Sequence, residues 1–328
     1  SLTVFMKRLL SKLALCAAIV LFLLALSSFI RTPWYLPELF SHFQLQYFMI
    51  GTLLLIALFF IRPWRPLSFF FIAAALMMNL INLWPYTDLN RLKPGADIRP
   101  IVVEDEQTYS LLQSNVFKFN FDYADFIDMV RNADPDIVLV FEMTQEWENA
   151  LRELTEIWPY YSVLPEHGSH GIGIFSKYPL ADVRFFNIAA DKVPALEVKL
   201  RLNGENLMLW GLHPRPPVNQ AFFNNRNQHF NWIIDHYPAY QDMPVVVAGD
   251  LNVTMFAPHY KRLVHGTGLM NARQGRGIQK SWFLKGIKPL GIPIDHFLHN
   301  DRVSVTYSNV TPDINSDHRP LLTYFRIN

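Results

Sequence analysis

Three long apolar runs make up most of the first quarter of the chain. They cover about residues 9–30, 43–61 and 67–84, and Lys12 is the only charged residue within them. A run of about 20 apolar residues is long enough to cross a hydrocarbon layer about 30 Å thick. A secretory signal peptide is the alternative for the first run, but its apolar core would be shorter, about 7 to 15 residues. We therefore expect three transmembrane helices, of which the third is the shortest.

After about residue 90 the pattern changes to short apolar segments separated by polar turns. The expected strands lie at 109–116, 136–141, 171–175, 195–202, 207–212, 245–248, 292–298 and 321–326. Helical patterns occur at 124–132, 145–154 and 219–236. Asn203 and Gly204 lie between two of the strands, which is typical of a tight hairpin. Many strands and few helices predict two sheets packed face to face with helices outside.

Several of the expected strands end on polar residues. Residues 245–254 read VVVAGDLNVT, so an apolar strand runs directly into Asp250 and Asn252. A buried carboxylate or amide without a partner loses its hydration, so such ends usually have a function. The other polar ends and turns contain Asn115, Glu142, His213, Asp295, Asp317 and His318. If these residues share one edge of the two sheets, a single cleft would suit a divalent cation and a phosphate.

The chemistry of phosphoester hydrolysis explains each residue type. Mg²⁺ prefers oxygen ligands and needs only one or two carboxylates, so Glu142 is the expected metal ligand. Asp250 with Asn252 would orient an attacking water and hold a phosphate oxygen. His318 would donate to a nonbridging oxygen, because a nearby carboxylate keeps an imidazole charged. His213 would contact the leaving oxygen or the phosphate.

Each motif also has a purely structural interpretation. Asp-Leu-Asn after a strand is often a turn, because Asp and Asn side chains bond to their own backbone. The Ser-Asp-His triplet at 316–318 equally suits a surface loop. Glu142 suits the start of the helix at 145–154, where negative charge is favourable. The occurrence of all these motifs in one chain favours the catalytic interpretation.

The order of the motifs resembles the endonuclease/exonuclease/phosphatase superfamily, which includes pancreatic-type deoxyribonuclease, neutral sphingomyelinases and inositol polyphosphate phosphatases. The matching segments within about residues 105–328 are SNVFKFN, DIVLVFE, HGIGIFSKYPL, GLHPRPP, VAGDLNVT, SW, IPIDHF and SDHRPL. The resemblance implies an α/β fold, a four-layer α/β/β/α sandwich of two mostly antiparallel sheets, that hydrolyses a phosphoester with Mg²⁺ or Mn²⁺. Phe141 stands where many members have Gln, and Pro214 where Thr is common, so the subfamily stays open.

The resemblance also assigns roles to the polar residues. The residues implied in metal binding are Glu142, Asn115 and Asp317. Those implied in catalysis are His213, Asp250, Asn252, Asp295 and His318, with Asp295 supporting His318. Those expected to bind substrate are Asn115, Asn252 and Trp282.

Positive charge beside the apolar runs predicts their orientation, because cytoplasmic loops are rich in Lys and Arg. Such residues are Lys7, Arg8 and Lys12 at the first run, Arg62 and Arg65 between the second and third, and only Arg31 between the first and second. We expect residues 1–88 to be a multi-pass anchor in a bacterial inner membrane with a cytoplasmic N-terminus. Residues 89–328 would then be a periplasmic catalytic domain. Met6 is a candidate start residue.

The charge balance after the apolar runs bears on the substrate. Six of the 29 Lys and Arg and two of the 28 Asp and Glu lie before residue 90, which leaves 23 basic and 26 acidic residues, a net charge of −3. This balance argues against a domain that wraps long nucleic acids. Tethering beside a bilayer favours a lipid head group. The alternatives are a periplasmic nuclease acting on DNA or RNA and a non-catalytic membrane scaffold. The bilayer is an expected partner, and no obligate protein partner is inferred.

The segment at 271–289, NARQGRGIQKSWFLKGIKP, contains five basic residues and no acidic one. Its cations could attract anionic head groups while Trp282, Phe283 and Leu284 enter the membrane interface. Alternatively it is a solvated loop whose Trp282 packs in the core or lines the cleft. A basic loop with an aromatic residue also suits a nucleotide backbone.

Overall fold

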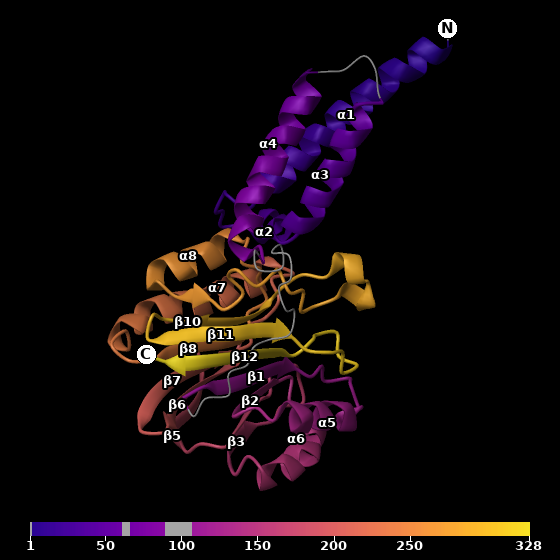
Figure 1. Cartoon of the computed structure of the whole chain (residues 1–328). Coiled ribbons are helices and arrows are strands. Elements are labelled where there is room, and N and C mark those ends of the chain that lie inside the picture. Colours follow the sequence, from indigo (N-terminus) through magenta and orange to yellow (C-terminus); the bar gives the residue numbers. More distant parts are fainter. Residues whose placement is uncertain (1, 61–65, 89–106) are drawn as a thin grey trace, which may run out of the picture.

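The computed structural model describes residues 2–60, 66–88 and 107–328. Its first part is a helical bundle, in which α1, α3 and α4 pack against one another (Figure 1). The elements are α1 (Leu2–Leu26), α2 (Tyr35–Ser41), α3 (Gln44–Leu58), α4 (Pro66–Leu83) and η1 (Trp84–Tyr86). Small residues allow these helices to approach one another closely. A side chain at Gly51 would lie 2.9 Å from Cδ2 of Leu76 on α4 and 3.0 Å from Cδ2 of Leu21 on α1.

All three predicted apolar runs are helical, but the second differs from the expectation. Within the described residues, Val4–Leu26 and Pro66–Tyr86 are long and apolar enough to cross a membrane. In the second run α3 has 15 residues and rises only about 22 Å, and α2 meets it at a bend of 63°. A third crossing therefore exists only if the bent pair α2 and α3 forms one broken span.

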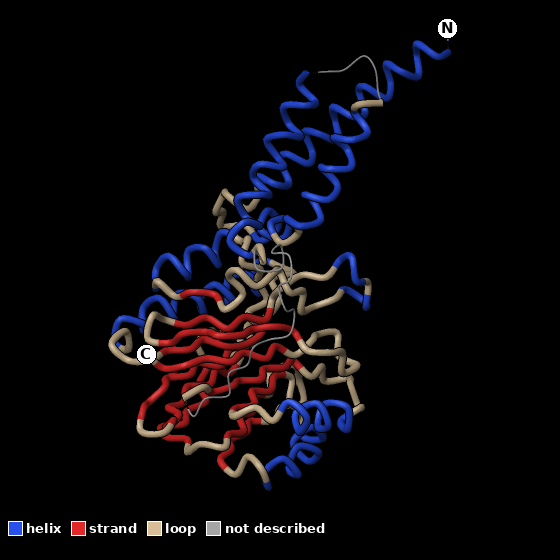
Figure 2. The backbone as a smooth tube through the Cα atoms, in the orientation of Figure 1, coloured by secondary structure: helices blue, strands red, loops and turns tan. Residues whose placement is uncertain are grey.

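The remainder of the described chain, residues 107–328, contains two six-stranded mixed sheets (Figure 2). The first sheet has the order β11-β12-β1-β2-β4-β3 and the second β5-β6-β7-β8-β10-β9. The strands are β1 (Tyr109–Asn115), β2 (Ile137–Phe141), β3 (Tyr160–Leu164), β4 (Ile172–Ser176), β5 (Leu180–Asn187), β6 (Pro194–Leu202), β7 (Glu205–Leu212), β8 (Val245–Asp250), β9 (Met270–Asn271), β10 (Asp295–His299), β11 (Val303–Val310) and β12 (Leu321–Ile327). Most neighbouring strands are antiparallel, as expected.

Helices cover the outer faces of both sheets. The helices and 3-10 turns are α5 (Tyr123–Ala133), α6 (Gln145–Leu151), η3 (Arg152–Glu156), α7 (Gln220–His236), η4 (Tyr237–Ala239), α8 (Pro258–Thr267), η5 (Leu284–Gly286) and η6 (Lys288–Leu290). Phe126 of α5 and Trp147 of α6 pack on the first sheet, while Phe230 of α7 and Tyr260 of α8 pack on the second. A third apolar layer lies between the sheets. The expected four-layer sandwich is confirmed.

The sequence pattern misses elements whose faces are only partly buried or that are short. It does not predict the strands β3, β5, β9 and β11 or the helices α2 and α8. The predicted strand at 292–298 begins too early, because β10 starts only at Asp295. Pro293 has no N–H for a hydrogen bond to a neighbouring strand, and Ile292 pairs only with Trp282 in an isolated bridge. The predicted helix at 145–154 is α-helical only to Leu151 and continues as η3. The hairpin at Asn203 and Gly204 is confirmed, with positive φ at both.

One parallel pair in each sheet brings the carboxyl ends of buried strands to the same rim. In the first sheet β1 runs parallel to β2, and in the second β7 runs parallel to β8. β10 is antiparallel to β8 and begins where β8 ends, with Asp295 opposite Asp250. Residues at the ends of four strands and the start of a fifth therefore lie along one edge of the sandwich.

The foot of the helical bundle rests against the second sheet's helices (Figure 1). Leu83 and Tyr86 share an apolar cluster with residues of α7 and α8. Lys261 of α8 donates to the backbone oxygen of Ser28 at 2.9 Å and to Oδ1 of Asn82 at 2.7 Å. The bundle and the sandwich thus share both apolar and polar contacts.

Candidate active site

The structure brings the predicted polar residues together at this rim. Asn115 ends β1, Glu142 follows β2, His213 follows β7 and Asp250 ends β8. Asn115 Nδ2 donates to Glu142 Oε1 at 3.1 Å and to Asp250 Oδ2 at 3.2 Å. The second bond joins the two sheets, since Asn115 belongs to one and Asp250 to the other. The rim is therefore a single polar site.

The local backbone turns these side chains toward the site. Glu142 has φ 59° and Asn252 has φ 49°, in the left-handed region that non-glycine residues rarely occupy. Such conformations are costly for a residue such as Glu142, and they cluster at functional sites. Gly249 has φ 143°, and a side chain there would lie 2.0 Å from the backbone oxygen of Leu212. A glycine before Asp250 therefore permits the close approach of β7 and β8.

His318 lies between two carboxylates and is almost completely buried. Its Nδ1 is 2.9 Å from Asp295 Oδ2, and its Nε2 is 3.4 Å from Asp250 Oδ2. Burial opposes the charged form, but the carboxylates of Asp295 and Asp250 outweigh it and raise the pKa of His318 to about 10. His318 is thus a charged donor at neutral pH, oriented by Asp295 more closely than by its neighbour Asp317.

Asp250 forms the centre of the polar cluster. Its Oδ2 is 3.4 Å from His213 Nε2, in addition to its contact with His318. Burial alone would raise the pKa of Asp250, but the charge of His318 and the hydrogen bond with His213 lower it to about 2. In turn burial disfavours a charged His213, and the bond with Asp250 reverses this and raises its pKa. Asp250 therefore stays ionised.

Asn252 and Trp282 also line the pocket of this site. The Asn252 amide nitrogen of the backbone donates to Asp250 Oδ1 at 3.0 Å, and its side chain donates to the oxygen of Pro214 at 2.9 Å. Trp282 Nε1 donates to Asp317 Oδ2 at 3.1 Å. Burial raises the pKa of Asp317. Among the described residues, Asp317 Oδ1 has no hydrogen-bond partner although it is buried.

The oxygen atoms of this site suit a hard divalent cation. Glu142 is half-buried, and its Oε2 accepts from the backbone N–H of Lys118 at 3.1 Å. The partnerless Asp317 Oδ1 adds a second carboxylate oxygen that needs a cation or a donor. By distance alone Asp250, Asp295 and His318 could also hold a metal, since one atom of each lies within 4.8 Å of the others. However, a charged imidazole has no lone pair to offer, which favours Glu142 as the ligand.

A pocket of about 540 Å³ opens above these residues. Its lining includes all the predicted site residues except Asn115 and Asp295, which lie beneath it. It also includes residues that the sequence pattern did not single out, namely Leu39, His42, Phe43, Ser169, His170, Pro216, Pro217, Val218, Ile292 and Ile294. His170 is the first residue of the HGIGIFSKYPL motif, so the sequence contained a signal that could have identified it as a site residue. No local sequence motif indicated that Leu39, His42 and Phe43 would line the pocket.

The basic segment at 271–289 is not a uniform surface patch. Arg273 is fully buried, and its Nη1 lies 3.4 Å from His296 Nδ1. Arg276 donates to the backbone oxygens of Ala272 and Val305. Trp282 lines the pocket, as expected for a solvated loop whose Trp282 lines the cleft. The idea that all five cations and Trp282 face a membrane or a nucleic acid is therefore wrong.

Comparison with known proteins gives the same fold. The Endonuclease/Exonuclease/phosphatase family profile matches residues 112–318. No curated protein sequence matches the chain. The structure of D. rerio TDP2 with a single-strand DNA product has 15% identity and a TM-score of 0.57, and the match covers 67% of this chain and 99% of that one.

Two further solved structures have different names and the same architecture. The human nocturnin catalytic domain with bound sulfate has 16% identity and a TM-score of 0.55, covering 71% of this chain and 96% of its own. Sphingomyelinase C from Streptomyces griseocarneus has 16% identity and a TM-score of 0.50, covering 67% and 99%. At such identities these likenesses show the fold alone. Because the family profile matches more than half of its residues, the chain belongs to the Endonuclease/Exonuclease/phosphatase family of phosphodiester hydrolases.

Proposed function

We propose that this protein is a membrane-anchored, divalent-metal-dependent phosphodiesterase whose substrate is a lipid head group or another phosphoester held near the membrane. The observation that carries this proposal is the position of the polar pocket. It lies at the foot of the apolar helical bundle, and three of its lining residues, Leu39, His42 and Phe43, come from the bundle side of the chain.

The residues of the rim divide the work of hydrolysis. Glu142, Asn115 and Asp317 would hold Mg²⁺ or Mn²⁺, which supplies Lewis-acid stabilisation of charge on the phosphoryl oxygens. Asp250, which lines the pocket, would accept a hydrogen bond from the attacking water and so orient it. His318, held by Asp295, donates to a nonbridging oxygen.

Three further residues complete the binding of the phosphoester. His213 faces Asp250 across 3.4 Å and reaches the attacking or leaving oxygen. Asn252 holds a phosphate oxygen from the loop that follows β8. Trp282 forms a wall of the pocket beside Asp317 and contacts the substrate.

Residues 1–88, which include the described helices α1 to α4, are the proposed anchor, and residues 89–328 are the proposed catalytic domain. Lys7, Arg8 and Lys12 at the start of α1 support a cytoplasmic N-terminus in a bacterial inner membrane and a periplasmic active site. Arg62 and Arg65, which support the same orientation, lie outside the described residues, as does the boundary after residue 88.

An exposed loop next to the bundle supports the bilayer as a partner. Leu284, Ile287 and Leu290 are 42%, 47% and 36% exposed, respectively. Gln46 of α3 donates to the backbone oxygens of Pro289 and Gly291, both at 3.1 Å, which holds this loop beside the foot of the bundle. Exposed apolar side chains at this level suit insertion into the membrane interface.

The alternative substrate is DNA or RNA in the periplasm. D. rerio TDP2, which shares the fold, was solved with a single-strand DNA product, and Trp282 offers an aromatic surface for a base. The net charge of −3 after residue 89 and the name of the bacterial sphingomyelinase favour the lipid. A non-catalytic scaffold is least favoured, because the polar residues converge in one pocket.

The test is a substrate screen with the full chain in lipid nanodiscs. With Mg²⁺ or Mn²⁺ present, phospholipids, sphingomyelin, isoprenyl phosphates, single- and double-stranded DNA and RNA are offered in parallel. We expect turnover of a lipid phosphoester that is lost in Asp250→Asn. Nuclease activity without lipid turnover would contradict the lipid assignment, and no turnover of any phosphoester would contradict the enzymatic one.

A further inference from the structure

The lining of the pocket contains two chemically different sets of residues. The polar set contains the groups proposed to act on phosphorus. The apolar set consists of Leu39, Phe43, Pro217, Val218, Ile292 and Ile294. A compact phosphoester would use the polar groups and leave much of the apolar lining in contact with water, which is unfavourable. The apolar lining therefore points to a substrate with a hydrocarbon part.

Two of the apolar lining residues belong to the α2–α3 elbow, residues 39–43. This elbow is the bend between α2 and α3. Phe43 lies immediately before α3, whose outward residues Met49, Ile50 and Leu53 are 56%, 53% and 67% exposed. Exposed apolar side chains therefore follow Phe43 along α3, where a bilayer would supply hydrocarbon chains.

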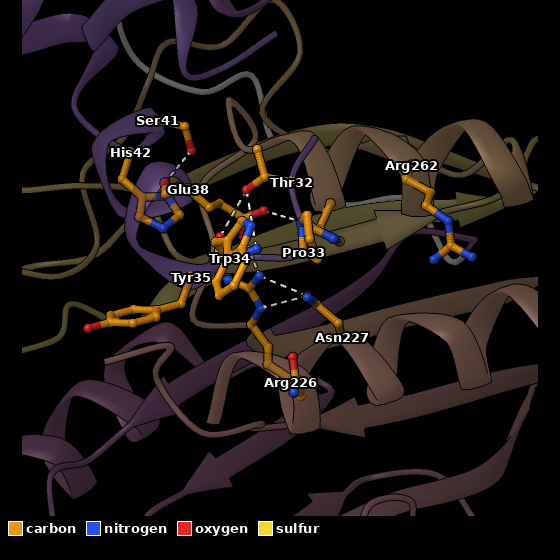
Figure 3. A network of polar contacts seen from close by, with 12 residues as sticks. Thr32, Pro33, Trp34, Tyr35, Glu38, Ser41, His42, Arg226, Asn227 and Arg262 are labelled. Carbon is orange, nitrogen blue, oxygen red and sulfur yellow. Dashed lines mark hydrogen bonds and ion pairs between the residues drawn. The ribbon is translucent and has the colours of Figure 1, made fainter. Parts of the chain in front are cut away.

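Buried polar contacts hold the elbow in place on the loop that follows β8. Glu38 of α2 pairs with Arg226 of α7 (Figure 3) and with His259 of α8. Arg226 also donates to the backbone oxygen of Asn252 at 3.3 Å. Moving α2 away would separate a buried carboxylate from a buried guanidinium and leave each without its oppositely charged partner, which is strongly unfavourable. The wall formed by Leu39 and Phe43 is therefore a fixed part of the pocket.

A second contact fixes the other end of the elbow. His42 Nδ1 lies 3.1 Å from Thr254 Oγ1 and 3.4 Å from the Thr254 backbone nitrogen. Thr254 is only four residues beyond Asp250. The elbow is thus tied to the same loop that carries the proposed catalytic residues.

We infer that the α2–α3 elbow is a subsite for the hydrocarbon part of the substrate next to the phosphoester. Leu39 and Phe43 form its wall on the membrane side, and Val218, Ile292 and Ile294 complete it. This inference rests on the proposed function and adds to it that the membrane segment itself selects the substrate.

The test uses p-nitrophenyl alkyl phosphates, in which the alkyl group grows from methyl to butyl to octyl. The reacting phosphorus and the leaving group stay the same throughout the series. The full chain in nanodiscs is assayed with Mg²⁺ for release of p-nitrophenolate. We expect kcat/KM to rise with the length of the alkyl group.

Two variants on α2 make a matched pair. Leu39 lines the pocket, whereas Leu36 is 51% exposed and does not. Leu39→Ser should lower kcat/KM for the octyl ester about tenfold, the effect of losing one leucine contact, and leave the methyl ester unchanged. Leu36→Ser should have the same kcat/KM as the unsubstituted protein for both the methyl and the octyl ester.

The outcomes separate the two proposals. A wild-type kcat/KM that does not depend on alkyl length would overturn the subsite while keeping the phosphodiesterase. Equal losses on the methyl and octyl esters in Leu39→Ser would show a merely structural role for this residue. Absence of p-nitrophenolate release from every ester would instead contradict the proposed function itself.

Discussion

Two buried clusters of charge contact the loop that follows β8. The rim cluster of Asp250, Asp295 and His318 borders the pocket. The elbow cluster of Glu38, Arg226 and His259 is enclosed between α2, α7 and α8. Both bury ionised groups, which is unfavourable unless the groups are paired.

The two clusters differ in how completely they are paired. In the elbow cluster each guanidinium nitrogen of Arg226 has a partner, and both oxygens of Glu38 are used. At the rim, two carboxylates share one imidazole, and the neighbouring Asp317 Oδ1 and His213 Nδ1 have no partner among the described residues. We interpret the complete cluster as one that fixes structure and the incomplete one as one that binds a ligand.

The largest effect is expected from removing the charge at the centre of the rim. Asp250→Asn keeps the shape of the side chain but removes its negative charge. We expect kcat on the most active phosphodiester to fall by about 10²- to 10⁴-fold, the range for loss of a positioned acid-base group. The melting temperature, followed by tryptophan fluorescence, should also fall, because the buried His318 loses one of its two carboxylate partners. Retention of a tenth of the activity would contradict the assigned role.

Substitutions in the elbow cluster should change the free energy of unfolding. Glu38→Leu leaves Arg226 buried and unpaired, and we expect the free energy of unfolding to fall by about 3–5 kcal/mol. Replacing both partners, Glu38→Leu with Arg226→Met, removes both charges and should recover most of this loss. Denaturation in detergent micelles gives the free energy of unfolding of the unsubstituted protein, the single variant and the double variant. A double variant as unstable as the single one would show that packing, and not charge pairing, accounts for the effect.

The same substitution in both regions tests metal binding. Glu142→Gln should increase the Mg²⁺ concentration required for half-maximal activity by about tenfold to a hundredfold, because it removes a charged ligand. Glu38→Gln should leave the Mg²⁺ requirement unchanged, since its carboxylate faces Arg226 and His259. Activity measured in EDTA with graded Mg²⁺ gives both values. Equal shifts in the two variants would remove the distinction between the clusters.

The smallest effect is expected at the contact between His42 and Thr254. Thr254→Val is nearly isosteric and removes one buried hydrogen bond of 3.1 Å. We expect a loss of about 1 kcal/mol in the free energy of unfolding and less than a threefold change in kcat. Denaturation and steady-state kinetics measure the two quantities. A larger loss of activity would show that this contact positions the catalytic loop.

Local sequence patterns predicted the parts of the fold that are buried on regular faces. β1, β2, β8 and the hairpin of β6 and β7 were found because their apolar residues are continuous or alternate. β5 was missed because it is an edge strand with no fully buried residue and its pattern is irregular, with a register shift between Ala181 and Arg184. α2 was missed because seven residues are too few for a clear helical period.

The sequence by itself determined that the chain has apolar helices at its start and polar residues at the ends of apolar strands. Both features follow from local burial, which is visible in the order of residue types. The family resemblance implied that Asp295 supports His318. Only the tertiary structure decided that Asp250 approaches the other ring nitrogen of His318, and that Glu38 meets Arg226 and His259 across 188 and 221 residues. Such contacts depend on sheet register and on the bend between α2 and α3, to which residues far apart in the chain contribute together.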